Sequence, residues 1–161
     1  MNAYGNSQSW LDFVARLSSR HVRFAIIGGH AVNFHGYLRA TEDVDIVFRR
    51  DAASEESLLR TLEEFEAFWI GDDIDPATGL ERTYPITMEH LRSHPLLMLG
   101  TTFGYVDLFD FLPGLPDVLF DDFLEEVVTS NGLPFASLEW LKRLKRVSNR
   151  PQDQIDLQRL P

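Results

Sequence analysis

Residues 43–48 read Asp-Val-Asp-Ile-Val-Phe, and this alternation of acidic and apolar side chains constrains the fold more than any other stretch of the chain. A period of two predicts a β-strand with one face in the core, so Asp43 and Asp45 project together from the opposite face. Two carboxylates this close repel each other unless a cation neutralises them, and Mg2+ prefers hard oxygen ligands. We therefore expect Asp43 and Asp45 to bind Mg2+ (or Mn2+).

A glycine pair precedes this strand and predicts a place for phosphate. Phe24 to Ile27 form a short apolar run, Gly28 and Gly29 follow, and the next residues, His-Ala-Val-Asn-Phe-His-Gly-Tyr, predict a helix that stops near Gly36. Glycines at a strand-to-helix junction let the backbone come close to a ligand, and the free N–H groups there suit phosphate oxygens. We expect Gly28 and Gly29 to approach a triphosphate.

Three nearby side chains are candidates for the same phosphate groups. His30 follows the glycine pair directly, so it either contacts phosphate or caps the helix. Arg39 and Thr41 stand just ahead of the acidic strand, where they either steady a triphosphate or only hold the loop. The remaining histidines have no spacing typical of a metal cluster.

A third carboxylate would complete a two-metal site, and Tyr-Val-Asp-Leu-Phe-Asp at residues 105–110 offers two. Asp107 is favoured because Val106 and Leu108 flank it with the same apolar-acid-apolar pattern that surrounds Asp45. Asp110 lies nearer a Pro-Gly turn, where a surface carboxylate is unremarkable. We expect Asp107 to bind metal or to act as the base for an acceptor hydroxyl.

The rest of the chain predicts an α/β (α+β) domain, in which a small mixed sheet is flanked by helices. Helical spacing of apolar residues and capping signals indicate helices, and strand-like runs with turn signals indicate hairpins. The helices are expected at 9–18, 54–68, 117–126, 137–147 and 151–160, the hairpins at 96–111 and 127–136, and a loop at 72–85.

Composition narrows the class of protein. The 161 residues predict a single domain over 1–161, with helices in 137–160 packing on the core. The chain has no cysteine, no basic and apolar leader and no run of about 20 apolar residues, which predicts a cytoplasmic protein without a membrane segment. A net charge of −10 repels nucleic acid overall, although Lys142, Arg143, Lys145, Arg146 and Arg150 form a local basic group.

The stretch IIGGHAVNFHGYLRATEDVDIVF resembles the signature of the DNA polymerase beta-like nucleotidyltransferases: an apolar strand, a glycine pair and an acid-apolar-acid strand. The downstream YVDLFDF and SLEWLKRLKRVSNRPQDQIDLQRL are similar to a bacterial subgroup of small, toxin-like or uncharacterised members. The resemblance covers most of the chain. It implies the polymerase beta palm-like fold and transfer of a nucleoside monophosphate from an NTP to an acceptor hydroxyl.

In that subgroup a lysine on the penultimate helix and an Arg-Pro-x-Asp segment recur, which the resemblance assigns to Lys145 and to Arg150, Pro151 and Asp153. A helical wheel places Lys145 at the edge of the buried stripe, so it is the best phosphate-contacting candidate. Many superfamily members have serine where this chain has Gly29, so phosphate contact here would depend on backbone N–H groups.

The resemblance also implies partners. The acceptor would be the 3′ end of a tRNA, a protein side chain or an aminoglycoside-like molecule, and a toxin-type enzyme would have an antitoxin protein. We also expect a homodimer for so small an enzyme. The alternative from a different class is a catalytically silent nucleotidyltransferase fold that acts as a binding or regulatory module.

Overall fold

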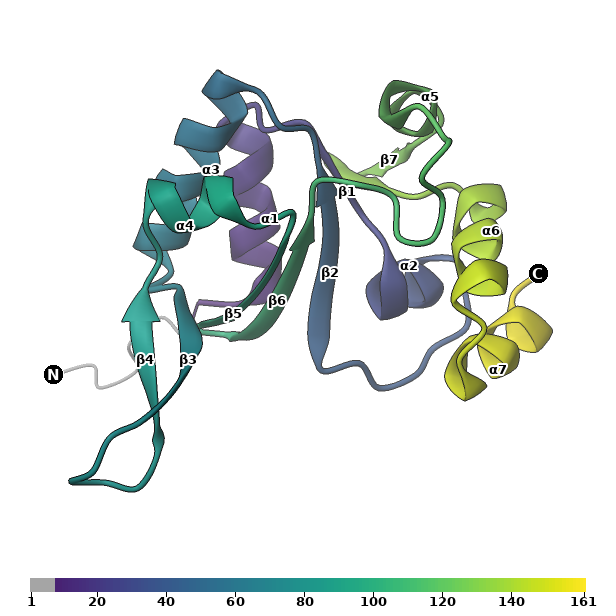
Figure 1. Ribbon diagram of the computed structural model, residues 1–161. Helices are drawn as coiled ribbons and strands as arrows, with labels where there is room; N and C mark the ends of the chain where they lie inside the picture. Colours follow the sequence, from purple (N-terminus) through teal and green to yellow (C-terminus); the bar gives the residue numbers. More distant parts are fainter. Residues whose placement is uncertain (1–7) are drawn as a thin grey trace, which may run out of the picture.

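The computed structural model describes residues 8–161, which form an eight-stranded mixed sheet flanked by helices (Figure 1). The strand order is β4-β3-β5-β6-β2-β1-β8-β7. The strands are β1 (Phe24–Ile26), β2 (Asp43–Phe48), β3 (Phe68–Ile74), β4 (Glu81–Pro85), β5 (Leu96–Thr101), β6 (Gly104–Phe109), β7 (Val128–Ser130) and β8 (Leu133–Phe135). The helices are α1 (Trp10–Ser19), α2 (Gly28–Phe34), α3 (Ala52–Glu64), α4 (Met88–Ser93), α5 (Phe120–Glu125), α6 (Leu138–Ser148) and α7 (Pro151–Arg159).

The mixed α/β architecture is therefore confirmed. Residues 1–7, which belong to the predicted 1–161 domain and to the part of the chain where no leader is expected, lie outside the described residues. Within residues 8–161, no helix combines the length and the apolar character needed to cross a membrane.

The helix starts follow local capping chemistry. Ser9 accepts a hydrogen bond from the backbone N–H of Asp12, and the Asp12 carboxylate accepts one from the backbone N–H of Ser9, so both ends of a capping box are present. Ser137 caps α6 in the same way through the N–H of Trp140, and Pro151 occupies the first turn of α7. These predicted helices are confirmed within one or two residues.

The centre of the sheet consists of β1, β2 and β6. Strand β2 runs antiparallel to β1 and parallel to β6, and its length matches the prediction for 43–48. Strands β5 and β6 form the predicted hairpin around Phe103 and Gly104. The two acidic strands, β2 and β6, are thus direct neighbours although about sixty residues of chain separate them.

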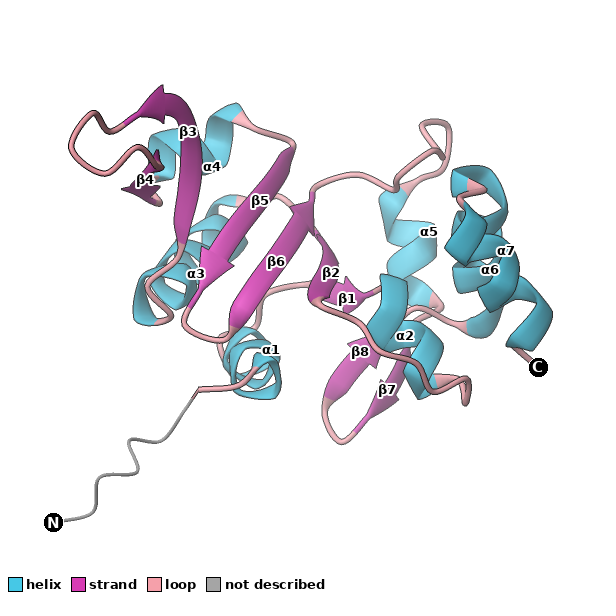
Figure 2. Cartoon of the chain, turned by 90° about the horizontal axis from the view of Figure 1, so that it is seen from below, coloured by secondary structure: helices cyan, strands magenta, loops and turns pink. Residues whose placement is uncertain are grey.

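Helices cover the two faces of the sheet unequally (Figure 2). On one face α1, α3 and α4 pack over a continuous core that includes Leu97, Leu99, Val106 and Leu108, each at most 1% exposed. On the other face α2, α6 and α7 lie over the β2, β1 and β8 end. The β6, β5, β3 and β4 part of that second face carries exposed apolar side chains, so it is left open.

The predicted loop at 72–85 is correct only for 75–80, because the residues on either side belong to the β3–β4 hairpin. Asp and Gly lower the strand propensity of this stretch, but cross-strand pairing outweighs it: Trp69 stacks on Tyr84 and the Tyr84 hydroxyl donates to the carboxylate of Asp73. The predicted helix at 54–68 is too long, since α3 ends at Glu64 and the chain turns at Glu66 with a positive φ of 52°. Helix α4 was not predicted.

The second predicted hairpin is present as β7 and β8, joined by Asn131 and Gly132, both with positive φ, as a tight hairpin turn requires. Strand β8 runs parallel to β1, pairing Phe135 with Ile26. This pairing connects the following helices to the centre of the sheet. Helix α6 then buries Trp140, Leu141 and Leu144 and contacts both α2 and α7.

Candidate active site

The three predicted carboxylates come from two adjacent strands. In the parallel pairing of β2 with β6, Asp45 lies directly opposite Asp107, and Asp43 lies opposite Tyr105, two residues away along the same face. Neighbouring strands are about 4.8 Å apart, so the side chains of Asp45 and Asp107 project side by side. Asp110, the rejected alternative, instead accepts a 2.7 Å hydrogen bond from Nε of Arg50.

The charges of this carboxylate group are uncompensated. Burial, followed by the charges of Asp107 and Asp43, raises the pKa of Asp45 to about 6, although Arg150 and Lys145 partly oppose the rise. Burial and the charge of Asp43 also raise the pKa of Asp107. In the described part of the chain, no Lys, Arg or His forms an ion pair with any of the three. The site therefore favours a bound proton or an external cation.

Gly28 is required by the position of Asp45. Its φ is +64°, a conformation that other L-residues rarely adopt, and a Cβ on it would lie 1.9 Å from Oδ2 of Asp45. The backbone at the start of α2 consequently lies directly against the Asp45 carboxylate. The N–H of Ile27 also donates to the carbonyl of Asp45 over 2.9 Å, which fixes the glycine turn to β2.

Thr41 fills the space beside Gly29. A Cβ on Gly29 would lie 2.4 Å from Oγ1 and 2.8 Å from Cβ of Thr41, and 3.2 Å from Nη1 of Arg39. The Thr41 hydroxyl donates to the carbonyl of Asp43 at 3.3 Å. A side chain at position 29 and the side chain of Thr41 would therefore occupy the same space. In this chain the Thr41 hydroxyl fills that space, and residue 29 is a glycine.

A group of five charged residues from α6, α7 and the loop before β2 lies beside the carboxylates. We name Arg39, Lys145, Arg150, Asp153 and Asp156 the C-terminal charge cluster. Lys145 Nζ donates to Asp153 over 2.8 Å and pairs with Asp156 at 2.7 Å, while Nε and Nη2 of Arg39 donate to the two oxygens of Asp156 at 2.8 and 2.9 Å. Arg150 Nε donates to Asp153 over 3.1 Å.

The centre of this cluster is buried, whereas Arg150 is 73% exposed, and its three cations and two carboxylates leave a net charge of +1. The side chains of Lys145, Asp153 and Asp156 are 5%, 2% and 0% exposed. Burial alone would raise the pKa of Asp156, but hydrogen bonds from Arg39, Lys145 and Gln152 outweigh it and hold that pKa below its ordinary value. Two of the three ammonium hydrogens of Lys145 are used by these carboxylates, which leaves one for another acceptor.

The two groups of charge face each other across a cavity of about 220 Å³. One part of its wall is polar, formed by the carboxylates, Gly28 and the cluster, and another part is apolar. Its lining comprises Ile27, Gly28, Asp45, Asp107, Phe109, Pro113, Leu141, Leu144, Lys145, Ser148, Arg150 and Asp153. A concave site with apolar walls and convergent polar groups is the usual form of a small-molecule site.

The structure does not bring every candidate equally close. Gly28, Asp45, Asp107 and Lys145 line the cavity itself, whereas Gly29, Arg39 and Thr41 lie next to one another beside it. His30 packs its ring against Trp10, with centroids 3.9 Å apart, and burial followed by the charge of Arg39 lowers its pKa. His30 thus packs on α1 and does not line the cavity, and its contact with phosphate stays a prediction.

Sequence reasoning missed Asp156 and the apolar wall. Asp156 is fully buried and holds both Arg39 and Lys145, yet in the sequence it is one acid among several on a polar helix. The available signal was Lys145 itself, because a lysine on the edge of a buried stripe requires a carboxylate partner.

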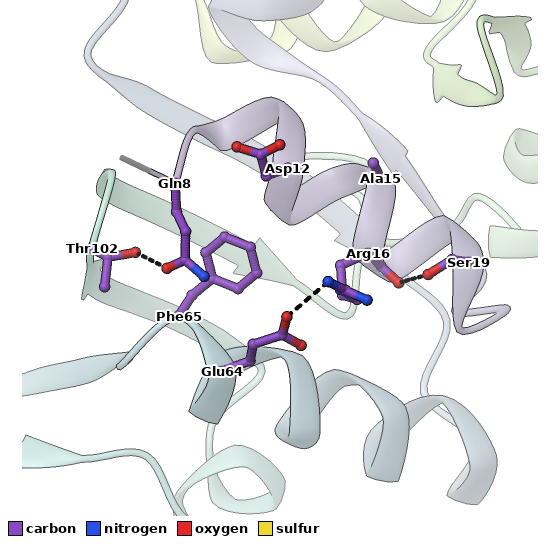
Figure 3. A pocket seen from close by; sticks show the side chains of 8 residues that line it. All are labelled: Gln8, Asp12, Ala15, Arg16, Ser19, Glu64, Phe65 and Thr102. Carbon is purple, nitrogen blue, oxygen red and sulfur yellow. Dashed lines mark hydrogen bonds and ion pairs between the residues drawn. The ribbon is translucent and has the colours of Figure 1, made fainter. Parts of the chain in front are cut away.

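A larger hollow of about 820 Å³ lies elsewhere, between α1, α3 and the turn after β5 (Figure 3). Its polar side chains mostly satisfy one another: Arg16 pairs with Glu64 at 3.0 Å, and the Thr102 hydroxyl donates to Gln8. None of the predicted site residues lines it. Its size alone does not make it the candidate site.

The donor atoms of the carboxylate group suit a hard metal ion. Three hard oxygen donors, two of which have a raised pKa and none of which has a cation partner in the described chain, fit Mg2+ or Mn2+. Among residues 8–161, however, no three His, Asp or Glu side chains are already drawn together as the ligands of one ion. Binding would require the carboxylates to close around the metal.

Comparison with models of known protein families gives no match, and comparison with curated proteins gives none either. Among solved structures, the crystal structure of JHP933 from Helicobacter pylori aligns with 89% of this chain and 60% of its own, with a TM-score of 0.45 and 14% sequence identity. The chain thus spans about three fifths of the length of that protein. At this level of similarity, neither a fold family nor a function is transferred.

Proposed function

We propose that this chain is a metal-dependent nucleotidyltransferase with the polymerase beta palm-like fold, which moves a nucleoside monophosphate from an NTP to an acceptor hydroxyl. The observation that carries the proposal is the register of β2 with β6. It places Asp45 beside Asp107 at the wall of a cavity, with Asp43 next along the same face but outside the lining, and none of the three has a cation partner in the described chain. The antiparallel β1 and the glycine turn that precedes β2 support the same reading.

Asp43, Asp45 and Asp107 would hold Mg2+ (or Mn2+), which when bound supplies positive charge to the triphosphate oxygens and lowers the pKa of the acceptor hydroxyl. If Asp107 does not hold the metal, it would instead accept the proton of that hydroxyl, because it lies beside Asp45 at the cavity.

The nucleotide would occupy the cavity between the carboxylates and α6. Gly28 and Gly29 leave the backbone open to the phosphates, and Thr41 and Arg39 stand beside Gly29 with a hydroxyl and a guanidinium. Lys145 would donate its remaining ammonium hydrogen to a phosphate oxygen. The nucleoside would lie against the apolar wall that includes Phe109 and Leu144.

The direct test is incubation with each α-labelled NTP, Mg2+ and a panel of acceptors that includes total tRNA, protein and aminoglycosides. Wild type should transfer label and release pyrophosphate, and Asp43→Ala or Asp45→Ala should reduce transfer by about a thousandfold, which corresponds to about 4 kcal/mol of transition-state stabilisation. Asp110→Ala is the matched control, since its carboxylate pairs with Arg50 away from the cavity. Equal activity in all four proteins would contradict the proposal.

A silent nucleotide-binding module is the second candidate, favoured by two observations. No three potential metal ligands are drawn together among residues 8–161, and Lys145 is already neutralised by Asp153 and Asp156. Thermal unfolding with Mg2+ and a non-hydrolysable NTP separates the candidates. An active site predicts stabilisation that requires metal and nucleotide together, whereas stabilisation by nucleotide alone, without transfer to any acceptor, would favour the silent module.

A further inference from the structure

The second face of the sheet is open beyond β6, although it continues the surface that carries the candidate carboxylates. Met98 on β5 lies directly opposite Asp107, and Gly100 lies opposite Tyr105 on β6 and opposite Phe68 on β3. Opposed residues share a face, so these side chains and the carboxylates form one surface. We name the part on β3, β4, β5 and β6 the open face.

The open face is apolar at its centre. Ile70, Met98 and Tyr105 are 46%, 67% and 55% exposed, and the Phe68 ring lies over Gly100, where a Cβ would approach it to 2.2 Å. Soluble proteins rarely leave several large apolar side chains exposed side by side unless the surface binds something. Exposure of these side chains, where helices cover β5 and β6 on the other side, therefore indicates a docking surface.

The charge of the open face has one sign. On β4, Glu81 lies on the same side as Thr83, the partner of Ile70, and adds one acid at the β3–β4 hairpin. With Asp43, Asp45 and Asp107, four acidic residues lie around the apolar centre. Of the described strand residues that point to this side on β2 to β6, none is Lys, Arg or His.

The open face and the cavity lie on opposite sides of Asp107. Helices α6 and α7 and the C-terminal charge cluster stand beyond β2, whereas β5, β3 and the projecting β4 hairpin extend from β6 in the other direction (Figure 1). Ile70 is two strands away from Asp107, about 10 Å at the usual strand spacing. A molecule on the open face would consequently meet a nucleotide in the cavity at Asp107.

We propose that the open face binds the acceptor, and that the acceptor is a basic polypeptide segment with apolar anchors and a Ser, Thr or Tyr hydroxyl. This inference depends on the proposed function for its chemistry. The hydroxyl oxygen bonds to the α-phosphorus of the NTP, the bond from that phosphorus to the bridging oxygen breaks, pyrophosphate leaves, and the hydroxyl proton passes to Asp107.

The acidic charge of the open face favours a basic polypeptide over a second copy of the chain and over RNA. In the metal-free chain, a second copy would bring two identical sets of four acidic residues together, and RNA would place its phosphates over them. Lysine and arginine instead complement the acids, and their neighbouring apolar side chains cover Ile70, Met98 and Tyr105. An apolar centre surrounded by a polar, charged rim is the usual form of a specific protein interface.

The test measures binding without nucleotide, so that it does not depend on transfer. Fluorescent peptides with a central serine and flanking Lys and Leu residues are compared with the same peptides carrying Glu in place of Lys, and with a single-stranded RNA oligonucleotide. Fluorescence anisotropy with the full chain should give a Kd at least about tenfold lower for the basic peptides, weakened by added salt.

Two substitutions at one position separate charge from apolar contact. Ile70→Lys and Ile70→Glu remove the same side chain, but only lysine reverses the local charge, so Ile70→Lys should weaken binding of the basic peptides about tenfold relative to Ile70→Glu. Leu119→Lys is the matched control, because Leu119 is 70% exposed in the segment before α5, away from the open face. Thermal unfolding confirms that all three variants are folded.

The inference is overturned if the acidic peptides or the RNA bind as tightly as the basic peptides, if no probe binds, or if Ile70→Lys and Ile70→Glu behave alike. Loss of label transfer with intact peptide binding would instead contradict only the proposed function. Conversely, transfer to RNA with no effect of the Ile70 variants would retain the enzyme and reject this acceptor surface.

Discussion

Asp45 and Asp156 are both aspartates near one cavity, but they differ in ion pairing and in the direction of their pKa shifts. Asp156 is fully buried, receives Arg39, Lys145 and Gln152, and has a lowered pKa. Asp45 receives no ion pair in the described residues, and its pKa is raised to about 6. The comparison indicates that Asp156 stabilises the fold, whereas Asp45 reduces stability until a cation from outside the chain joins it.

The largest expected effect is a loss of stability on removal of Asp156, the aspartate whose charge is paired. Asp156→Ala leaves Arg39 and Lys145 buried without a shared partner, so the free energy of unfolding should fall by about 3–5 kcal/mol. Urea denaturation measures it, and Glu56→Ala, which breaks an exposed pair with Arg60, is the control that should change little. A loss below about 1 kcal/mol would mean that the cluster is not structural.

Asp45→Asn removes the aspartate whose charge is unpaired, and it should raise the free energy of unfolding, whereas Asp156→Ala lowers it. Since a raised carboxylate pKa means that the folded state binds the proton more tightly than the unfolded state, wild-type stability should fall as pH rises from about 4 to about 6 and then level off. The asparagine variant should show a smaller fall, which Asp107 with its raised pKa still causes, and should be more stable than wild type by roughly 2 kcal/mol at pH 8 without metal. Thermal unfolding across this pH range, with and without Mg2+ and NTP, measures both effects.

Destabilisation by Asp45→Asn in metal-free buffer at pH 8 would contradict the contrast between Asp45 and Asp156. That result would mean that Asp45 has a structural partner, like Asp156. If the variant is stabilised but keeps its response to metal and nucleotide, the carboxylate is strained for a reason other than metal binding.

A smaller effect concerns Gly29 and Thr41, which share one volume beside the cavity. Gly29→Ser should lower the free energy of unfolding by about 1.5 kcal/mol, because its Cβ would meet the Thr41 hydroxyl. Thr41→Gly, which removes both the hydroxyl and the Cβ at this position, should relieve most of that penalty, so the double variant should be more stable than the two single effects predict. A double-mutant cycle measures the coupling, and additive effects would contradict the shared volume.

The smallest expected effect is at Asp110, three residues beyond Asp107. Its ion pair with Arg50 is partly exposed, so Asp110→Asn should cost at most about 1 kcal/mol and leave nucleotide-dependent stabilisation unchanged. Asp107→Asn should reduce that stabilisation while changing the stability of the free chain little or favourably. If the two variants affect nucleotide response alike, the distinction between the carboxylates is wrong.

Local patterns explain why much of this arrangement could be predicted from the sequence. The alternation at 43–48 gives β2 its bounds, Ser9 and Ser137 cap their helices as expected, and the Asn131-Gly132 turn joins β7 to β8. The choice of Asp107 over Asp110 rested on its apolar neighbours, which are the residues that bury one face of β6.

Features that depend on distant partners could not be predicted in this way. The β3–β4 hairpin depends on cross-strand contacts such as Trp69 with Tyr84, which composition does not reveal. The role of Asp156 depends on Arg39 and Lys145, residues on other elements. The polymerase beta-like family, the metal and the nucleotide remain predictions from resemblance and geometry, to be decided by the experiments above.

The bond between Arg39 and Asp156 joins residues 117 positions apart, and this separation has a consequence for protein synthesis. On the ribosome, the glycine turn and both acidic strands emerge well before α7. Until α7 is made, Arg39 and Lys145 have no ion pair with Asp153 or Asp156. Pairing of β8 with β1 is similarly late. Long-range contacts of this kind slow folding, so the cavity can assemble only after nearly all the described chain has been translated.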